Sequence, residues 1–453
     1  MARVSSILVR IANDLEQYLP EESVLATFRA AGHAWRERQL GPVRTLHLFI
    51  LQVLACNTAM AHLRHMAGEV FSLAGYCQAR ARLPLSALQA LLRDSSAAMR
   101  AAAIKTAGDN GHPGGELWHG LRAFLVDGSS TITPDTPDLQ KTFGQPKGQK
   151  PGCGFPVPKL LALFDAFTGM VVEMLGFPLY THEQSKVWML HPMLKANDLL
   201  VGDRGFCSFV HLAMLQVRGV KACFRCHQKQ IVQFRTRDKR PGAQRKGGPS
   251  SQFVRRLSKH DQIVRWKRPP AKPDWMTPDQ WAAMPEWLEV RELRYSLTSN
   301  GQRTHVVTIA TTLLDETLYP KGEVAELYGL RWGVETRLSE LKTTLKMRKL
   351  KSKSPEGVMK ELAIYCLVYN LVRTVTTAAG LRQKVDPDRI SFIDALRWLL
   401  LAEPGAPIPD LIVNKVRNRH EPRAIKDLQD TYTKMIRPRE VLRQELRNAG
   451  GLN

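Results

Sequence analysis

Five short apolar runs between residues 121 and 226 constrain the fold of this chain most strongly. They read RAFLVDGSS, KLLALFDAFTG, MVVEMLGF, DLLVGDRGF and GVKACFRC, and each ends in turn-forming or polar residues. Runs of this length are typical of strands that are buried on both faces, and helical stretches such as 208–217 lie between some of them. The pattern predicts an α/β fold.

Composition divides the rest of the chain. Residues 1–118 are rich in Ala, Leu and Arg, carry apolar residues at helical spacing and end in the loop GDNGHPGGE. We therefore predict an N-terminal helical domain, an α/β core in two parts with a mainly β insertion between them, and a C-terminal region that is helical and then basic. The expected boundaries are 1–118, 119–228, 229–319, 320–400 and 401–453.

Charge identifies the kind of partner. The 453 residues include 65 Lys and Arg against 42 Asp and Glu, a formal net charge of +23. Residues 225–272 alone hold 15 Lys and Arg against only Asp238 and Asp261. An excess of this size predicts a polyanionic partner, most simply nucleic acid.

The sequence also predicts the compartment. No apolar run reaches the roughly 18–20 residues of a membrane span, and the N-terminus lacks the features of a secretion signal. Seven scattered cysteines do not resemble a disulfide framework. We expect a cytoplasmic protein without a membrane partner.

Two aspartates stand where predicted strands end. Asp127 follows AFLV and precedes GSS, and Asp203 follows LLVG and precedes RGF. This is the position from which α/β sheets present functional side chains. An Asp before a turn is more often only a turn residue, so neither position is specific by itself.

A third element is more specific. In ELYGLRWGVETRLSELKTTLK, four polar residues fall within about 60° of one another on a continuous helix. They are Tyr328, Arg331, Glu335 and Lys342. A separate apolar stripe would pack on the sheet and is formed by Leu327, Leu330, Val334, Leu338, Leu341 and Leu345. An ordinary solvated face would explain an Arg–Glu pair at i, i+4, but not the tyrosine and lysine on the same line.

The spacing Tyr-(2)-Arg-(3)-Glu-(6)-Lys resembles the signature of DDE transposases of bacterial insertion sequences, in their cut-and-paste group. Asp127 in VDGSS and Asp203 in GDRGF resemble the two other acidic motifs of that family. Similarity continues upstream in YCQARARLP and downstream in KSKSPEGVMKELAIYCLVYNLVR. The resemblance implies a ribonuclease H-like catalytic core interrupted by a β insertion.

The resemblance also implies a chemistry. Asp127, Asp203 and Glu335 would be catalytic residues that bind two Mg²⁺ ions, or Mn²⁺, about 3.5–4 Å apart. The expected reaction is hydrolysis at the transposon end, which frees a 3′-hydroxyl that then attacks target DNA. Arg331, Lys342 and Tyr328 would contact phosphates beside the scissile bond.

The same resemblance implies partners. The protein would bind double-stranded DNA at inverted-repeat ends and at the target, and would act as a homodimer in a synaptic complex. In relatives the transferred end passes through a hairpin, and a flipped base stacks on a tryptophan of the insertion. The candidates are Trp266, Trp275, Trp281 and Trp287, with Trp287 slightly favoured because it precedes a strand-like run.

Other signals are weaker. Cys223 and Cys226 form a CxxC without a second ligand pair, which favours buried thiols over zinc. The run 72–83, with Gln78, Arg80 and Arg82, is either a DNA-recognition helix or an ordinary solvated helix. Two alternative functions remain: a catalytically silent DNA-binding descendant, and a ribonuclease H-like nuclease without strand transfer.

Overall fold

The computed structural model describes residues 18–36, 38–68, 70–109, 117–230, 232–234, 250–297, 305–403, 405–414 and 434–449. Residues 235–249, which hold much of the basic stretch of the predicted insertion, lie outside the described residues. So do the tail cations Lys415, Arg417, Arg419, Arg423 and Lys426.

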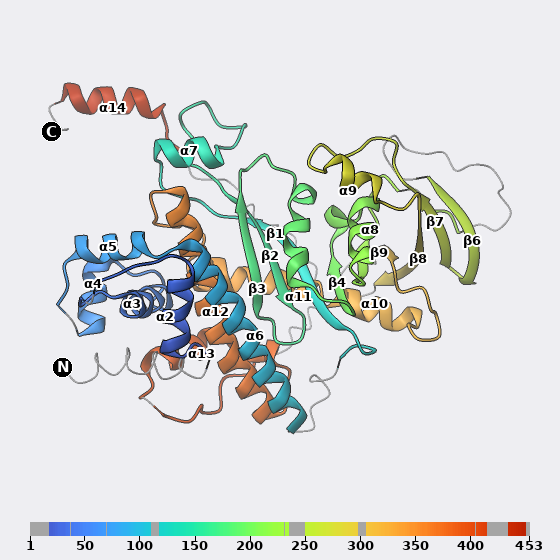
Figure 1. Cartoon of the computed structure of the whole chain (residues 1–453), viewed down its shortest axis with the longest axis horizontal. Helices are drawn as coiled ribbons and strands as arrows, with labels where there is room; N and C mark the ends of the chain where they lie inside the picture. Colours follow the sequence, from blue (N-terminus) through green and yellow to red (C-terminus); the bar gives the residue numbers. More distant parts are fainter. Residues whose placement is uncertain are drawn as a thin grey trace, which may run out of the picture.

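One nine-stranded sheet organises the described structure, in the order β3-β2-β1-β4-β5-β9-β8-β7-β6 (Figure 1). All five predicted runs form strands of this sheet: β1 (Arg122–Ser130), β2 (Lys159–Asp165), β3 (Val171–Phe177), β4 (Asp198–Gly202) and β5 (Lys221–Arg225). β1 pairs in parallel with β4, which pairs in parallel with β5, whereas β2 and β3 run antiparallel. The predicted α/β class is confirmed.

The predicted β insertion extends this sheet instead of forming a separate one. Its strands are β6 (Ser251–Ser258), β7 (Asp261–Lys267), β8 (Trp287–Leu297) and β9 (His305–Thr311), with the short helix α9 (Pro278–Ala282) between β7 and β8. β9 joins the two halves by pairing with β5 on one side and β8 on the other. A buried ion pair of 2.6 Å between Arg291 and Asp261 ties β8 to the start of β7.

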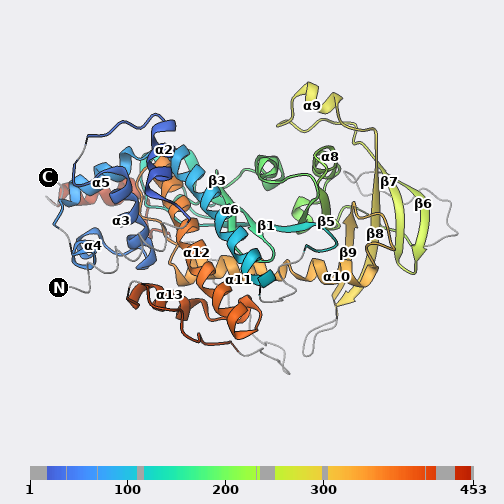
Figure 2. The same ribbon diagram turned by 60° about the horizontal axis from the view of Figure 1, so that its bottom comes forward.

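Two hydrophobic cores lie on opposite faces of the sheet, because alternate residues of a strand point to opposite faces. Leu125 and Val201 face the core formed with α6 (Leu85–Asp109), α11 (Trp332–Ser339) and α12 (Pro355–Gln383). Val126 and Leu200 face the core formed with α8 (Phe209–Val217), so the predicted helical stretch 208–217 is confirmed. Figure 2 shows α6, α12 and α11 on one side of the strands and α8 on the other.

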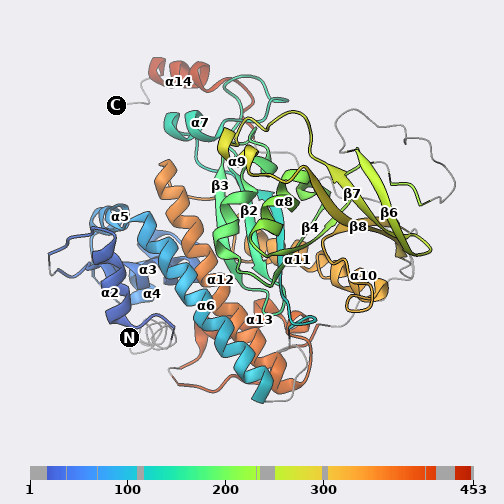
Figure 3. The same ribbon diagram turned by 45° about the vertical axis from the view of Figure 1, so that its right-hand side comes forward.

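The N-terminal helices gather beside the long pair α6 and α12. Figure 3 shows α2 to α5 packed beside this pair, at the end of the molecule opposite β6 and β7. The helices not yet placed by residue, these four and four others, are α2 Glu21–Ala30, α3 Pro42–Leu54, α4 Met60–Ala67, α5 Leu73–Arg82, α7 Pro137–Phe143, α10 Lys321–Gly329, α13 Phe392–Leu401 and α14 Arg439–Asn448. Short 3₁₀ turns form η2 (Glu183–Ser185), η3 (Val187–Met193), η4 (Arg204–Phe206) and η6 (Pro387–Arg389).

Of the helices in the described ranges, only α12 is long and apolar enough to cross a membrane. However, 89% of its apolar window is buried inside the protein, where it packs against α6, α3 and β3. Packing within the core therefore accounts for the apolar character of α12.

Candidate active site at the carboxyl ends of β1 and β4

Asp127 and Asp203 lie at the same edge of the sheet. β1 and β4 are parallel neighbours in which Val126 pairs with Gly202. The residue that follows each of these two is an aspartate, Asp127 and Asp203. Each carboxylate accepts a hydrogen bond from the following backbone N–H: Asp127 from Gly128 at 2.8 Å, and Asp203 from Arg204 at 2.6 Å. The register thus brings together two acidic residues that are 76 positions apart.

The helix predicted to carry Glu335 is broken into three parts. α10 ends at Gly329, α11 begins at Trp332, and Glu340–Thr344 form a π-helical turn, η5. Around the junction, the N–H groups of Arg331 and Val334 bond to carbonyls three residues earlier, both at 3.1 Å. This tighter turn rotates Leu330 outward. Leu330 is 48% exposed, so its predicted place in the apolar stripe is wrong, while the other five residues of that stripe are buried.

Arg331 lies between two of the three carboxylates. Its side chain is only 7% exposed; Nη1 is 3.8 Å from Asp127 Oδ2, and Nη2 is 3.3 Å from Glu335 Oε1. The guanidinium also packs over the Trp332 ring at 4.3 Å, and its Nε has no hydrogen-bond partner. One buried cation therefore links the sheet edge to α11, and it retains an unused donor.

The three carboxylates are close enough to affect one another. Burial, together with the charges of Asp203 and Glu335, raises the pKa of Asp127 to about 6 against the opposing effects of the Gly128 N–H and of Arg331. Mutual repulsion of this kind is expected of carboxylates that share a cation site. A carboxylate with so high a pKa marks a candidate functional site.

The donor set suits a divalent cation, although the side chains do not converge on one point. All three groups offer hard oxygen ligands, which Mg²⁺ prefers. In the described part of the chain, no three Asp, Glu, His or Cys side chains gather closely enough to hold a metal ion as they stand. At this site the Arg331 guanidinium lies between Asp127 and Glu335. The three carboxylates fit a divalent cation in chemistry and position, but the Arg331 side chain would have to move out from between them.

Tyr328 does not lie where we expected it. The sequence placed it on the exposed edge of the stripe, but it is 1% exposed and its hydroxyl has no partner. Burial raises its pKa, and Asp203 and Arg331 are among the charges that act on it. The cause is the turn at 330–331, which separates α10 from α11 and leaves Tyr328 on a buried face beneath Arg331. Direct contact with DNA phosphate is therefore not available to Tyr328 in this conformation.

Lys342 reaches the sheet edge from the π-helical turn. Its Nζ donates to Ser129 Oγ at 3.2 Å, and Ser129 lies two residues beyond Asp127 on the same face of β1. The wider turn thus directs Lys342 toward the acidic edge, although the helix that carries it is not the regular one that we predicted.

The candidate tryptophans differ in environment. Trp266 is buried and donates to Glu292 at 3.0 Å, which is a structural role. Trp287 is partly exposed at the start of β8, with Lys267 Nζ 5.6 Å from its ring. Trp275 stacks on Trp188 of η3, with ring centroids 6.4 Å apart. The base-stacking role predicted for Trp287 stays a prediction.

Contacts lead from this tryptophan pair toward the acidic edge. Trp188 Nε1 donates to the carbonyl of Ser185 in η2 at 3.0 Å. From the same short turn, the Glu183 carboxylate lies over Gly128, where a Cβ atom would meet Glu183 Oε1 at 2.6 Å. Sequence reasoning missed Glu183 and Trp188, because neither lies in a motif and their proximity is set by tertiary packing.

The CxxC pair is not a metal site in this structure. Cys223 is buried, and burial raises its pKa well above the ordinary value. A hydrogen bond with Cys207 and burial raise the pKa of Cys226 in the same way. Both thiols are therefore neutral; Cys223 is buried, as the sequence favoured, whereas Cys226 is only partly buried.

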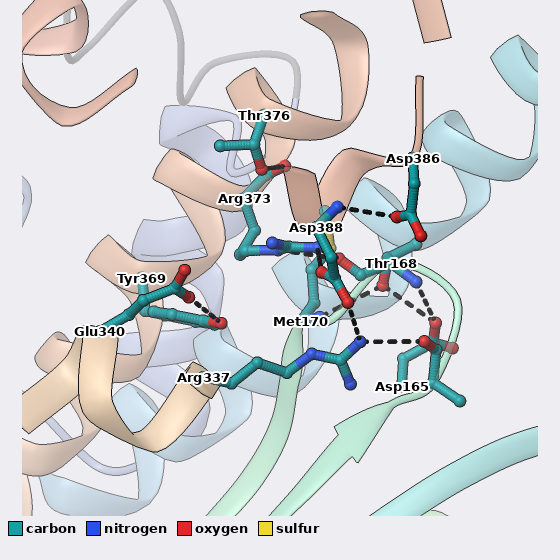
Figure 4. Close-up of polar contacts among 11 residues, drawn as sticks. Asp165, Thr168, Met170, Arg337, Glu340, Tyr369, Arg373, Thr376, Asp386 and Asp388 are labelled. Atoms are coloured by element: carbon teal, nitrogen blue, oxygen red, sulfur yellow. Dashed lines mark hydrogen bonds and ion pairs between the residues drawn. The ribbon is translucent and has the colours of Figure 1, made fainter. Parts of the chain in front are cut away.

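A hydrogen-bond network around two buried arginines holds the far side of α11 (Figure 4). Arg337 donates to Asp388 at 3.1 Å and to the carbonyl of Ala166 at 3.1 Å. Arg373 of α12 donates to the same carboxylate at 2.7 Å and to the carbonyl of Thr168. The network thus fixes α11, and with it Glu335, against the β2–β3 turn and α12.

Comparisons with known proteins identify the family of the chain. Residues 118–371, more than half of the chain, match the family described as "Transposase DDE domain". The chain is 26% identical over 347 residues to the transposase InsG for insertion sequence element IS4 of Escherichia coli strain K12, covering 73% of this chain and 71% of that protein. A cryo-EM structure of the piggyBac transposase synaptic complex with hairpin DNA covers 88% of this chain and 80% of that one at a TM-score of 0.41 and 11% identity. The family match spans β1, β4 and the segment 328–342, and the chain therefore belongs to the DDE-domain transposases of insertion sequences and functions in DNA transposition.

Proposed function

We propose that the chain is a metal-dependent transposase that cuts DNA at the inverted-repeat ends of its element and joins the freed ends to target DNA. The observation that carries this proposal is the meeting of Asp127, Asp203 and Glu335 around one arginine, with the pKa of Asp127 raised to about 6. A site with this charge is poised to bind cations beside a DNA phosphate.

The sheet order supports a more specific fold. In the order β3-β2-β1-β4-β5, only β2 runs opposite to the other four strands, which is the arrangement expected of a ribonuclease H-like core. We propose that residues 119–228 and 320–400 form this core, and that 229–319 are inserted between its second and third acidic residues. Tyr328, Arg331, Glu335 and Lys342 would then be the Tyr-Arg-Glu-Lys signature of the cut-and-paste group.

Asp127, Asp203 and Glu335 would hold two Mg²⁺ ions, with Mn²⁺ as a substitute. Bound there, the ions would supply activation of the attacking oxygen and stabilisation of the leaving oxygen. Arg331 would transfer from its carboxylates to the phosphate beside the scissile bond, using donors such as its unpaired Nε. Lys342 would contact the next phosphate as a point charge, and Tyr328 would position Arg331 from beneath.

The assembly is part of the same proposal. Two ends of an element must be cut and joined together, so we propose a homodimer in the synaptic complex. The reaction would take place in the cytoplasm and pass through a hairpin at each end. A base flipped from that hairpin would stack on a tryptophan of the insertion, either Trp287 or the Trp275–Trp188 pair.

The products of one reaction test the proposal. The full-length protein is incubated with Mg²⁺ and a plasmid that carries both ends of its element, and the products are sequenced. Flush excision followed by joining supports the proposal. Cleavage without joining would identify a nuclease, and binding without cleavage would identify a catalytically silent descendant.

A further inference from the structure

A basic strap, residues 346–353, leaves the candidate active site and crosses toward the N-terminal helices. It follows the π-helical turn and contains Lys346, Arg348, Lys349, Lys351 and Lys353, with no acidic residue between Glu340 and Glu356. All five cationic side chains are exposed, although Lys351 Nζ also donates to the carbonyl of Asn57. In the described part of the chain, no carboxylate lies within ion-pair distance of Lys346, Lys349 or Lys353.

The backbone of the strap is fixed on its inner side. Met347 and Leu350 are buried, which turns the cations between them outward. Ile132, just beyond β1, forms two backbone hydrogen bonds with the strap, to Arg348 at 3.0 Å and from Leu350 at 2.9 Å. Thr131 Oγ1 donates to the carbonyl of Met347 at 2.6 Å. The strap is therefore tied directly to the strand that carries Asp127.

The other end of the strap is held by a buried carboxylate. Glu361 of α12 is fully buried and accepts hydrogen bonds from the N–H groups of Lys351 at 3.0 Å and Ser352 at 2.8 Å. Asn57, which precedes α4, donates to the same carboxylate at 2.7 Å. Because the backbone is anchored at both ends, the cations are presented at fixed positions, which reduces the entropy lost when they bind a ligand.

Lys346 occupies a conformation that disfavours lysine. Its φ is +65°, in the left-handed region where glycine is the least strained residue. A non-glycine residue held there carries a conformational cost, and such cost is concentrated at functional sites. Lysine at this position makes sense if its charge is needed where the helix ends.

The strap leads to a groove beside α5. This groove, of about 680 Å³, is lined by Arg80 together with Lys351 and Lys353. Arg80 is held in place by stacking 3.6 Å from the Phe49 ring centroid and by donating to Gln52 at 2.9 Å. Cationic residues are thus found from Lys342 at the acidic edge, through the strap, to Arg80 in the groove.

We propose that the basic strap binds consecutive phosphates of the duplex DNA that flanks the scissile bond, and so sets the register of the DNA in the active site. This inference rests on the proposed function. It goes beyond it by assigning a second DNA contact that lies outside the acidic site and outside the basic stretch 225–272.

The test measures binding without cleavage. The full-length protein is titrated in Ca²⁺ against a fluorescein-labelled random-sequence DNA duplex over a range of salt concentrations. Each lost phosphate contact should lower the slope of log K against log salt by about 0.9, and should weaken binding roughly fivefold near physiological salt. The variant with Lys346, Lys349, Lys351 and Lys353 all changed to Gln should therefore lose most of its affinity and about 3.6 units of slope.

A single variant separates charge from folding. Lys346→Gly relieves the positive φ, so it should raise the Tm while it weakens DNA binding. Lys384→Gly is the matched control, because Lys384 is also exposed and has a φ of +57°. It follows the C-terminal end of α12, about 40 Å along the helix from the N-terminal end that the strap adjoins. It should raise the Tm and leave DNA binding unchanged.

The outcomes distinguish the two levels of the proposal. If the four-Lys variant binds with the wild-type salt slope while Asp127→Asn abolishes Mg²⁺-dependent cleavage, the strap proposal is wrong and the proposed function stands. If the wild-type protein binds DNA but never cuts it, the proposed function fails, and a lower slope for the strap variants would still support a DNA-binding strap. Equal losses of affinity for Lys346→Gly and Lys384→Gly would also overturn the strap proposal.

Discussion

The segment that carries Glu335 also carries two buried arginines, and their surroundings differ. Arg337 shares Asp388 with Arg373, so two guanidiniums serve one carboxylate. Arg331 contacts both Asp127 and Glu335, with Asp203 nearby, so one guanidinium serves an acidic group of three. Glu340 lies close enough to Arg337 and Arg373 to act on both, so the charges of the first cluster balance, whereas the second cluster is short of positive charge.

The pKa values follow the same division. Burial alone would raise the pKa of Asp388, but Arg373 and Arg337 lower it below its ordinary value. Burial raises the pKa of Asp127 to about 6 in spite of Arg331. A cluster with satisfied charges stabilises the fold, whereas a cluster short of positive charge is suited to receive a cation.

Breaking the satisfied cluster should have the largest effect on stability. Asp388→Ala leaves the Arg337 and Arg373 side chains, which are 4% and 2% exposed, without their shared counter-charge. Loss of one partner from a fully buried pair typically costs about 3–5 kcal/mol, and because the Asp388 carboxylate is itself 42% exposed, we expect a cost at the lower end of that range. Urea unfolding measures this change, with Asp410→Ala as control, since that residue pairs with Arg382 on the surface and should cost less than about 1 kcal/mol. Equal costs would remove the distinction between the clusters.

The next largest effect should be a loss of folding stability at low pH, caused by His211, which lies in neither cluster. His211 stacks against His191 and Phe224, and burial lowers its pKa to about 4. Because its unfolded pKa is higher, near 6.5, the unfolded state binds the proton first, and stability falls as the pH drops from 6.5 toward 4. The loss should reach about 3 kcal/mol at pH 4.

Urea unfolding at several pH values measures this loss. His211→Gln should be less stable at pH 7, because packing is disturbed, but should lose less between pH 6.5 and 4 than the wild type. An unchanged pH profile would show that His211 is not the group responsible.

The smallest effect should be a gain in folding stability when the Asp127 carboxylate is removed. Since the folded pKa of Asp127 is raised from 3.8 to about 6, the protonated form is favoured on folding. This contribution is fully present below pH 4 and is lost as the pH rises through 6. Asp127→Asn should therefore increase stability at pH 7 in EDTA by about 1–3 kcal/mol, and the gain should vanish near pH 4. A destabilised variant would mean that Asp127 serves the fold.

Local patterns in the sequence predicted the sheet edge well. Strand runs followed by Asp127 and Asp203 were sufficient, because strand ends and turn residues are adjacent in sequence. The helical stripe was predicted only in part. Nothing in 326–346 identifies the tight turn at Leu330, the π-helical turn or the left-handed Lys346, since all three depend on how the segment packs against β1 and α12.

Contacts between distant segments were beyond prediction. Asp388 meets Arg337 across 51 residues, and Glu183 meets Gly128 across 55, without any motif at either end. Single-residue signals were also ambiguous where chemistry and structure use the same residue types. Arg80 shows this: it lies in the candidate recognition helix α5, but it folds back onto Phe49.

The central claim is that Asp127, Asp203 and Glu335 form one divalent-cation site for DNA cleavage. The most direct test is the single-turnover cleavage rate of end-bearing DNA in Mg²⁺ for Asp127→Asn, Asp203→Asn and Glu335→Gln, beside wild type in EDTA and the exposed control Glu326→Gln. We predict that each site variant and the EDTA reaction lose roughly a thousandfold in rate, and that Glu326→Gln cuts normally. Cleavage by any of the three variants within a few-fold of the wild-type rate, or undiminished cleavage in EDTA, would contradict the claim.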